Sequence, residues 1–193
     1  MDNLIYDIEI EKAICGRGKE RLPDIEYCGG WNDQENMGIS VLCAFDQATN
    51  ESRVFTGSNK DQFAALCQER RVIGFNSRKF DDQVLKKVWG IDVPNPFDIL
   101  VAIWEGDGLK PTFAPRTHGG YGLDACCETN FGVKKTGHGA MAPVDWQRGK
   151  IGDVVDYCLH DVYMTNRLLQ HIQLCGGILS PKEPGKFISV KLF

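Results

Sequence analysis

The chain has 193 residues, of which 42% are hydrophobic and 25% charged, and its formal net charge is −4. These values are ordinary for a soluble globular protein and leave room for one domain with a sizeable core, or one domain with an insertion. No apolar run approaches the roughly 18 residues of a membrane span. Met1-Asp2-Asn3 leads into no signal-like segment. We therefore expect a cytoplasmic protein that does not enter a membrane.

Eight cysteines are scattered along the chain without a C-x-x-C pair. An even number of cysteines does not by itself predict a disulfide framework in a chain of this length. Several fall at expected core positions of strands and helices. We expect reduced thiols in a reducing compartment.

The first half of the chain predicts strands followed by helices. Three strands are predicted at residues 3–10, 37–45 and 52–55. Residues 11–36, between the first two, are more than a hairpin needs and predict an insertion or a flap. A helix at 59–71 follows, then a short buried strand at 72–75 and a helix at 80–89.

The second half is predicted to be mainly helical. Helices are expected at 97–104, 123–131 and 151–174, with a loop at 105–122 rich in Gly and Pro. The last helix is expected to stop at Gly176-Gly177, a typical C-terminal cap. The order of elements predicts an α/β fold, with a mixed sheet and helices packed on it. We expect a single domain over residues 1–193, with an inserted segment at about 11–36 and a C-terminal tail at about 176–193.

Two acidic residues lie in the first predicted strand. Because side chains alternate along a strand, Asp7 and Glu9 point to the same face, about 7 Å apart. An ordinary exposed strand face has the same pattern. Asp81 follows a predicted strand end and starts a predicted helix, where it would also serve as an N-terminal cap or as a partner of the helix dipole.

A third acidic position lies on the last predicted helix. Tyr157 and Asp161 are four residues apart and therefore share one helix face. They are expected beside the apolar stripe, where a solvated pair would also lie. The stripe itself is expected to contain Val155, Cys158, Leu159, Val162 and Leu169.

Four carboxylates in this order favour a site for hard divalent cations, because Mg²⁺ and Mn²⁺ prefer oxygen ligands. Two such ions roughly 4 Å apart can clamp a phosphodiester during hydrolysis. The net charge of −4 does not argue against a nucleic-acid substrate, because such a site lowers the total by itself. Two basic pairs near the site, Arg78-Lys79 and Lys134-Lys135, are candidate phosphate contacts or solvated surface.

The three patches together resemble the motifs of the DEDD-type 3′–5′ exonucleases, which have a ribonuclease H-like fold. They read Asp7-Ile8-Glu9, then Asn76 to Phe80-Asp81, then Tyr157-Cys158-Leu159-His160-Asp161. Asp156 stands where the histidine subclass has its histidine, so the resemblance is to the tyrosine subclass. It runs from about residue 3 to 172, and the insertion at 11–36 departs from the family's compact pattern.

The resemblance implies two ions of Mg²⁺ or Mn²⁺ per site and release of nucleoside 5′-monophosphates from single-stranded 3′ ends. Asp7 would bridge the two ions. Glu9 and Asp161 would complete the ligands of the ion that activates water, and Asp81 would help hold the second ion through water. Tyr157 would position the attacking water. The substrate-binding candidates are Asn76, Phe80 and Lys134, and Phe80 has an alternative role in the core.

Other readings stay open. A catalytically silent nucleic-acid-binding module and a structural domain would share the fold. The sequence does not decide between DNA and RNA, and a replication or repair partner would act in trans. The tail predicts either a closing strand, since Ile188, Val190 and Leu192 alternate with polar residues, or a docking peptide for a sliding clamp ending in Leu192-Phe193.

Overall fold

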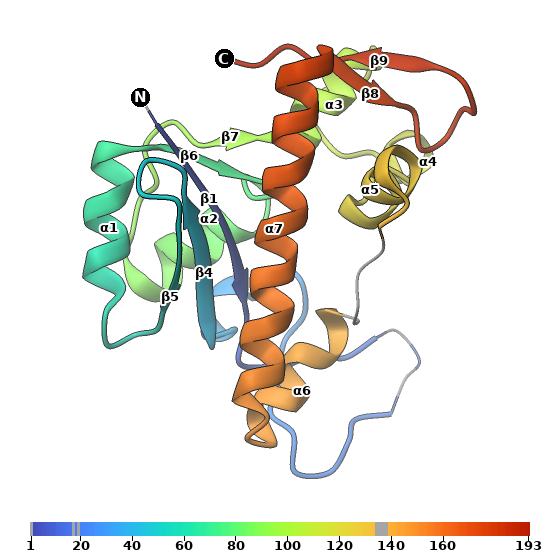
Figure 1. Cartoon of the computed structure of the whole chain (residues 1–193). Helices are drawn as coiled ribbons and strands as arrows, with labels where there is room; N and C mark the ends of the chain where they lie inside the picture. Colours follow the sequence, from blue (N-terminus) through green and yellow to red (C-terminus); the bar gives the residue numbers. More distant parts are fainter. Residues whose placement is uncertain (1, 17, 19, 134–138) are drawn as a thin grey trace.

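A mixed five-stranded sheet forms the centre of the protein, with strand order β5-β4-β1-β6-β7 (Figure 1). The computed structural model describes residues 2–16, 18, 20–133 and 139–193. Strands β4 and β5 are antiparallel to their neighbours, whereas β6 and β7 continue parallel to β1. The strands are β1 (Asn3–Glu9), β4 (Val41–Asp46), β5 (Glu51–Phe55), β6 (Arg71–Gly74) and β7 (Phe97–Asp98). The expected mixed sheet with flanking helices is confirmed.

Strand β1 is the middle strand and contributes side chains to two separate cores. Leu4, Tyr6 and Ile8 belong to one hydrophobic cluster, and Ile5 belongs to the other. This alternation follows from the period of two along a strand. It places Asp7 and Glu9 on the same face as Ile5, as predicted.

Helices cover both faces of the sheet. On the face of Ile5, the 25-residue helix α7 (Ile151–Cys175) packs along β1 and β4 (Figure 1). It ends at Gly176, whose φ of +75° is the left-handed conformation of a glycine cap. On the other face lie α1 (Lys60–Glu69) and α2 (Asp81–Val84), the latter continued by a π-helix at Leu85–Trp89.

Several predicted boundaries were wrong. The helix expected at 97–104 begins with strand β7, and α3 spans Ile99–Gly106. Two residues paired to β6 are too few to leave a periodic signal. The carboxylate of Asp98 accepts from the backbone N–H of Leu100 and Val101 and so caps α3. The expected loop at 105–122 contains a short helix, α4 (Pro115–His118), and α5 (Leu123–Phe131) follows as predicted.

Two further short elements precede the long helix. They are a 3₁₀ turn at Gly139–Met141 and α6 (Ala142–Gln147). The sequence did not predict them because six residues are too few to show a helical period.

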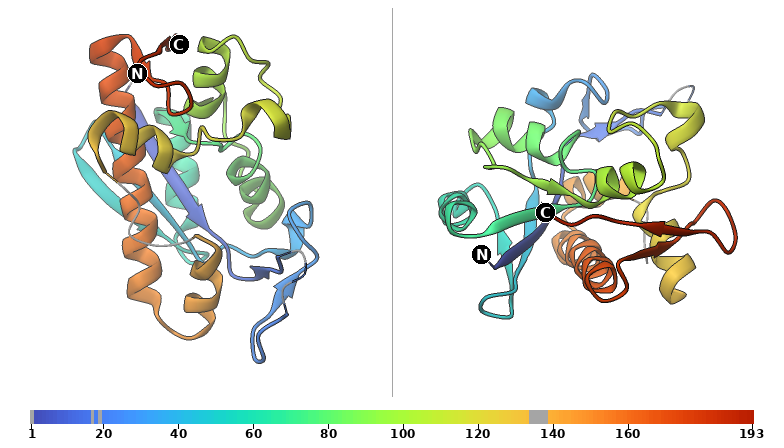
Figure 2. Two further views of the ribbon diagram at one scale, coloured as in Figure 1. Left: turned by 90° about the vertical axis from the view of Figure 1, so that its right-hand side faces the viewer. Right: turned by 90° about the horizontal axis from the view of Figure 1, so that it is seen from above.

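The segment at 11–36 leaves β1 and projects from one end of the sheet (Figure 2, left). It contains the two-residue strands β2 (Ala13–Ile14) and β3 (Tyr27–Cys28), which pair in parallel, and a 3₁₀ turn at Gln34–Asn36. Its ends are closed by backbone hydrogen bonds: Lys12 N–H donates to Met37 O at 2.9 Å, and Ser40 N–H donates to Glu9 O at 2.9 Å.

The C-terminal tail forms a hairpin beside the end of α7 (Figure 1). Strand β9 (Phe187–Ser189) pairs with β8 (Gly177–Leu179), so the tail is a strand but does not extend the main sheet. The ring of Phe193 lies 3.7 Å from the Arg71 guanidinium and 4.8 Å from the Phe97 ring centroid. The last residue therefore packs on the body of the protein, and these contacts give the sliding-clamp alternative no support.

The eight cysteines are present as thiols, and six of them are buried. No helix among the described residues is long and apolar enough to cross a bilayer.

Candidate functional site

Three carboxylates converge between the central strand and the long helix. Asp7 and Glu9 extend from β1, and Asp161 extends from the α7 face that packs on this strand. One ligand oxygen from each of the three lies within 4.8 Å of the others. Glu9 and Asp161 are buried, with 7% and 5% of their surfaces exposed. Oxygen ligands at such spacing fit a hard divalent cation, because carboxylates withdrawn from water need a compensating charge.

Asp161 lies within the buried face of α7 rather than beside it. Three of the five predicted stripe residues are buried, whereas Val155 and Leu159 are only half-buried. The buried face extends instead to Val154 and Asp161, and α7 packs with this face on β1 and β4.

The first residue of α2, Asp81, lines the same cavity, whose volume is about 260 Å³. Its side chain is buried, and the N-cap position is taken by Phe80, so the capping alternative for Asp81 was wrong. Burial, and then the charge of Asp7, raise the pKa of Asp81 well above its ordinary value. A fourth carboxylate close to the other three has an unfavourable charge that a bound cation would relieve.

Tyr157 lines this cavity from α7, one turn before Asp161. It is half-buried. A Cβ atom built on Gly139 would lie 3.2 Å from the Tyr157 hydroxyl oxygen, so the 3₁₀ turn approaches the hydroxyl closely because it carries a glycine there. The hydroxyl therefore lies beside Gly139, which lines the same cavity.

The turn that carries Asn76 and Phe80 is fixed by one buried carboxylate. Asp98 accepts from the backbone N–H of Asn76 at 2.9 Å and of Arg78 at 3.1 Å. Asn76 has a φ of +63°, a conformation that asparagine tolerates better than most residues. Burial raises the pKa of Asp98, and these backbone donors offset part of that rise. The turn is thus held in place, with Asn76 and Phe80 lining the cavity.

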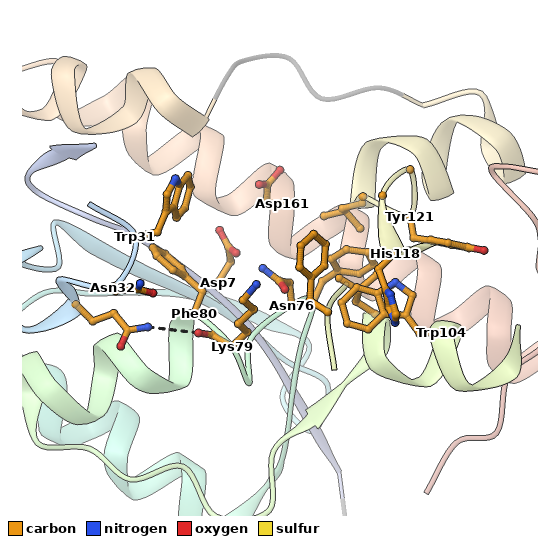
Figure 3. A pocket seen from close by; sticks show the side chains of 18 residues that line it. Asp7, Trp31, Asn32, Asn76, Lys79, Phe80, Trp104, His118, Tyr121 and Asp161 are labelled. Carbon is orange, nitrogen blue, oxygen red and sulfur yellow. Dashed lines mark hydrogen bonds between the residues drawn. The ribbon is translucent and has the colours of Figure 1, made fainter. Parts of the chain in front are cut away.

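A larger groove of about 640 Å³ adjoins the acidic cavity and shares Asp7 and Asp161 with it (Figure 3). In Figure 3, Trp31 and Phe80 lie on one side of Asp7, and Trp104, His118 and Tyr121 lie on the other. Lys79 lies between the two groups. The groove walls are therefore aromatic, and Lys79 is the only lysine or arginine among the described lining residues.

The predicted basic residues differ in their positions. Lys79 is exposed and lines the groove. Arg78 donates from Nε and Nη2 to the carbonyl oxygen of Pro96 at 3.1 and 2.9 Å, and it lines a neighbouring pocket. Lys134 lies outside the described residues, as does Lys135.

Sequence reasoning missed most of the groove. Trp31 comes from the insertion, Phe113 from the long loop, and the backbone of Gly119 to Gly122 completes the wall. These residues have no fixed spacing from the acidic motifs. The signals that were present are the unusually long insertion and the Gly-rich loop, both of which are frequent in binding regions.

Comparison with known proteins identifies similar structures but no similar sequence. No protein-family model matches the chain, and a search of characterised protein sequences finds no match. The family B DNA polymerase of the archaeon Pyrobaculum calidifontis superposes with a TM-score of 0.59 at 17% identity, covering 89% of this chain and 24% of the polymerase. RNase D of Trypanosoma brucei superposes with a TM-score of 0.55 at 16% identity, covering 90% of this chain and 57% of that protein. The chain thus has the ribonuclease H-like fold and spans only part of the length of either protein.

Proposed function

We propose that this protein is a 3′–5′ exonuclease that depends on Mg²⁺ or Mn²⁺ and acts on single-stranded nucleic-acid ends. The observation that carries the proposal is the convergence of Asp7, Glu9 and Asp161 within 4.8 Å, in a cavity that Asp81 and Tyr157 also line. These are the residues of the three motifs that resemble the DEDD exonucleases. The fold shared with RNase D, a ribonuclease by name, is in agreement.

The donor set fits the implied ions. Mg²⁺ and Mn²⁺ bind carboxylate oxygens, and burial, followed by the charge of Asp7, raises the pKa of Asp81, which a bound cation would counter. Asp7, Glu9 and Asp161 would hold the ions, with Asp81 lining the same cavity. When bound, two such ions lower the pKa of a coordinated water and neutralise charge on the leaving oxygen.

The remaining residues bind and orient the reactants. The Tyr157 hydroxyl, at the cavity, would hydrogen-bond the attacking water and fix its direction. Asn76 and Phe80 would contact the terminal nucleotide, Asn76 through its amide and Phe80 by its ring face. Burial of Glu9 and Asp161 limits access of bulk water and strengthens the electrostatic interactions inside the site.

Product analysis tests this function directly. Matched DNA and RNA oligonucleotides, labelled at the 5′ end or the 3′ end in turn, are incubated with Mg²⁺, Mn²⁺ or EDTA. The 5′ label should give a ladder that shortens by one nucleotide, and the 3′ label should be released at once as a mononucleotide. Binding without any metal-dependent cleavage would identify a nucleic-acid-binding module instead.

A further inference from the structure

The groove beside the acidic cavity has an aromatic wall at each end. One wall consists of Trp31 and Phe80, whose ring centroids are 5.7 Å apart with their planes at 64°. At the other end, Phe113 lies with its ring centroid 6.1 Å from that of Trp104 and 6.1 Å from that of His118. Figure 3 shows Asp7 and Asn76 between the two ends.

Trp31 is the most exposed aromatic side chain facing the groove, with 68% of its surface exposed. It lines both the acidic cavity and the groove, so it stands at their junction. An indole this exposed contributes little to the core, and its large apolar face remains available for contact.

The segment carrying Trp31 is attached to the body of the protein at several points. The Gln34 side chain donates to the carbonyl oxygen of Lys79 at 3.4 Å and accepts from Lys87 Nζ at 3.0 Å. The carboxylate of Asp33 accepts from the backbone N–H of Gly29 and from the side chain of Asn36, both at 2.6 Å. Trp31 is thus part of a wall held in place by these contacts.

The second wall carries a cation. The ammonium of Lys79 lies 4.2 Å from the centroid of the Phe113 ring, which is 41% exposed. Phe113 lines the groove and also a further pocket of about 320 Å³ on the side away from the acidic cavity. Trp31 therefore adjoins the acidic site, and Phe113 lies at the more distant end.

We propose that the groove binds the last two bases of an unpaired strand, the terminal base against Trp31 and the preceding base against Phe113. Lys79, whose ammonium lies over the Phe113 ring, would contact the phosphate on the 5′ side of the penultimate nucleotide. This inference rests on the proposed exonuclease function. The groove volume of about 640 Å³ is within the usual range for ligand pockets. Base-paired nucleotides stack on one another and offer no free face to such walls, so the ends of a duplex must separate first.

The test measures binding of a ten-nucleotide single strand, prepared as DNA and carrying a 5′ fluorophore, by fluorescence anisotropy in EDTA. Three versions are compared: the intact strand, one lacking the terminal base and one lacking the penultimate base. Trp31→Ala should weaken binding of the intact strand about 5- to 150-fold, the range for loss of one stacked base. It should not weaken binding of the strand without a terminal base any further.

Phe113→Ala should give the converse pattern, with its effect lost on the strand that lacks the penultimate base. Trp31→Phe should retain most of the affinity because it keeps a ring. Tyr163→Ala is the matched control, since Tyr163 is 54% exposed on α7 and is not among the lining residues of the groove or the acidic cavity. Equal losses on all three strands, or no loss with Trp31→Ala, would overturn the assignment.

Hydrolysis by the wild type distinguishes the two proposals. If the wild type cleaves and Trp31→Ala leaves the KM for the intact strand unchanged, the stacking assignment fails and the exonuclease function stands. If the wild type does not cleave with Mg²⁺ or Mn²⁺, the exonuclease function fails whatever the binding pattern. Melting temperatures of the variants identify any loss of folding, which is not expected because Trp31 is largely outside the core.

Discussion

The acidic cavity and the aromatic groove adjoin each other but are built in different ways. The cavity takes Asp7, Asp81 and Asp161 from a central strand and two helices, whose backbone positions are set by the sheet and its two cores. The groove takes Trp31 and Phe113 from irregular segments held by side-chain contacts. Under the proposed function, the residues assigned to the chemistry are positioned by regular elements of the fold, whereas those assigned to substrate binding lie on irregular segments, where binding residues are frequent.

This difference predicts two kinds of mutant. Changes in the cavity should lower kcat, and changes in the groove should raise KM. A mutant that broke this division would show that the two regions act as one.

The largest expected effect comes from Asp7→Ala, which should lower activity at least about a thousandfold, because several kcal/mol of metal-dependent stabilisation is lost. The fold should survive, since Asp7 is only half-buried. Without metal, the variant should melt at a higher temperature than the wild type, because one of the mutually repelling carboxylates is gone. Asp2→Ala, an exposed position just before the same strand, is the control. Undiminished hydrolysis by Asp7→Ala would remove the cavity from the reaction.

Tyr157→Phe should lower kcat about 10- to 1000-fold with little change in KM, the range for losing one positioning group. The change deletes only the hydroxyl that lies beside Gly139. Steady-state kinetics together with a metal titration provide the measurement, and metal affinity should barely change. Tyr163→Phe, on the exposed side of the same helix, should behave as the wild type. A variant that failed to fold would instead show that Tyr157 is needed for packing.

Two adjacent aspartates on α2 sharpen the comparison, since their side chains lie in different environments. Asp81 lines the cavity, whereas Asp82 accepts a hydrogen bond from the Tyr6 hydroxyl in the packed face. Burial raises the pKa of Asp82 from 3.8 to about 6, so folding takes up a proton between these pH values. The free energy of unfolding should therefore fall by up to about 3 kcal/mol as pH rises from about 4 to 6.

Asp82→Asn removes this contribution. Its stability relative to the wild type should increase over the same pH range, measured by urea denaturation at each pH. Asp61→Asn, at an exposed position of α1, should show no such trend. A constant difference between Asp82→Asn and the wild type at every pH would contradict the assigned titration.

The smallest expected effect is that of Lys79→Ala, which should raise KM about 3- to 10-fold and leave kcat nearly unchanged, because a single phosphate contact is lost. The slope of log KM against log salt concentration should fall by about one. Lys191→Ala, at an exposed position of the tail, is the matched control for charge. If Lys79→Ala altered kcat and not KM, the groove would belong to the chemistry rather than to binding.

The sequence predicted the regular part of the site because periodicity determines where side chains point. Asp7 and Glu9 share a face on any strand, and Tyr157 and Asp161 share one on any helix. The order and spacing of the motifs indicated the fold, which the structure confirms. The roles of these residues in catalysis stay predictions.

Tertiary packing determined what the sequence did not predict. The burial of Asp161 depends on how α7 rests on β1 and β4. The position of Trp31 beside Phe80 depends on hydrogen bonds between residues far apart in the chain, such as Gln34 to Lys79. No local pattern encodes such contacts, and short elements such as β7 and α6 leave too few residues for a period to appear.

The insertion at 11–36 begins and ends at neighbouring points, since the backbones at Lys12 and Met37 are hydrogen-bonded to each other. A segment closed in this way can change length at a modest entropic cost, about 0.6 kcal/mol for each doubling. Several of its contacts with the body, such as those of Gln34 with Lys79 and Lys87, involve side chains, and its own strands do not pair with the central sheet. Under the proposed function, changes in the insertion would alter the groove that binds the strand, whereas the four carboxylates are supplied by the central strand and the helices of the fold.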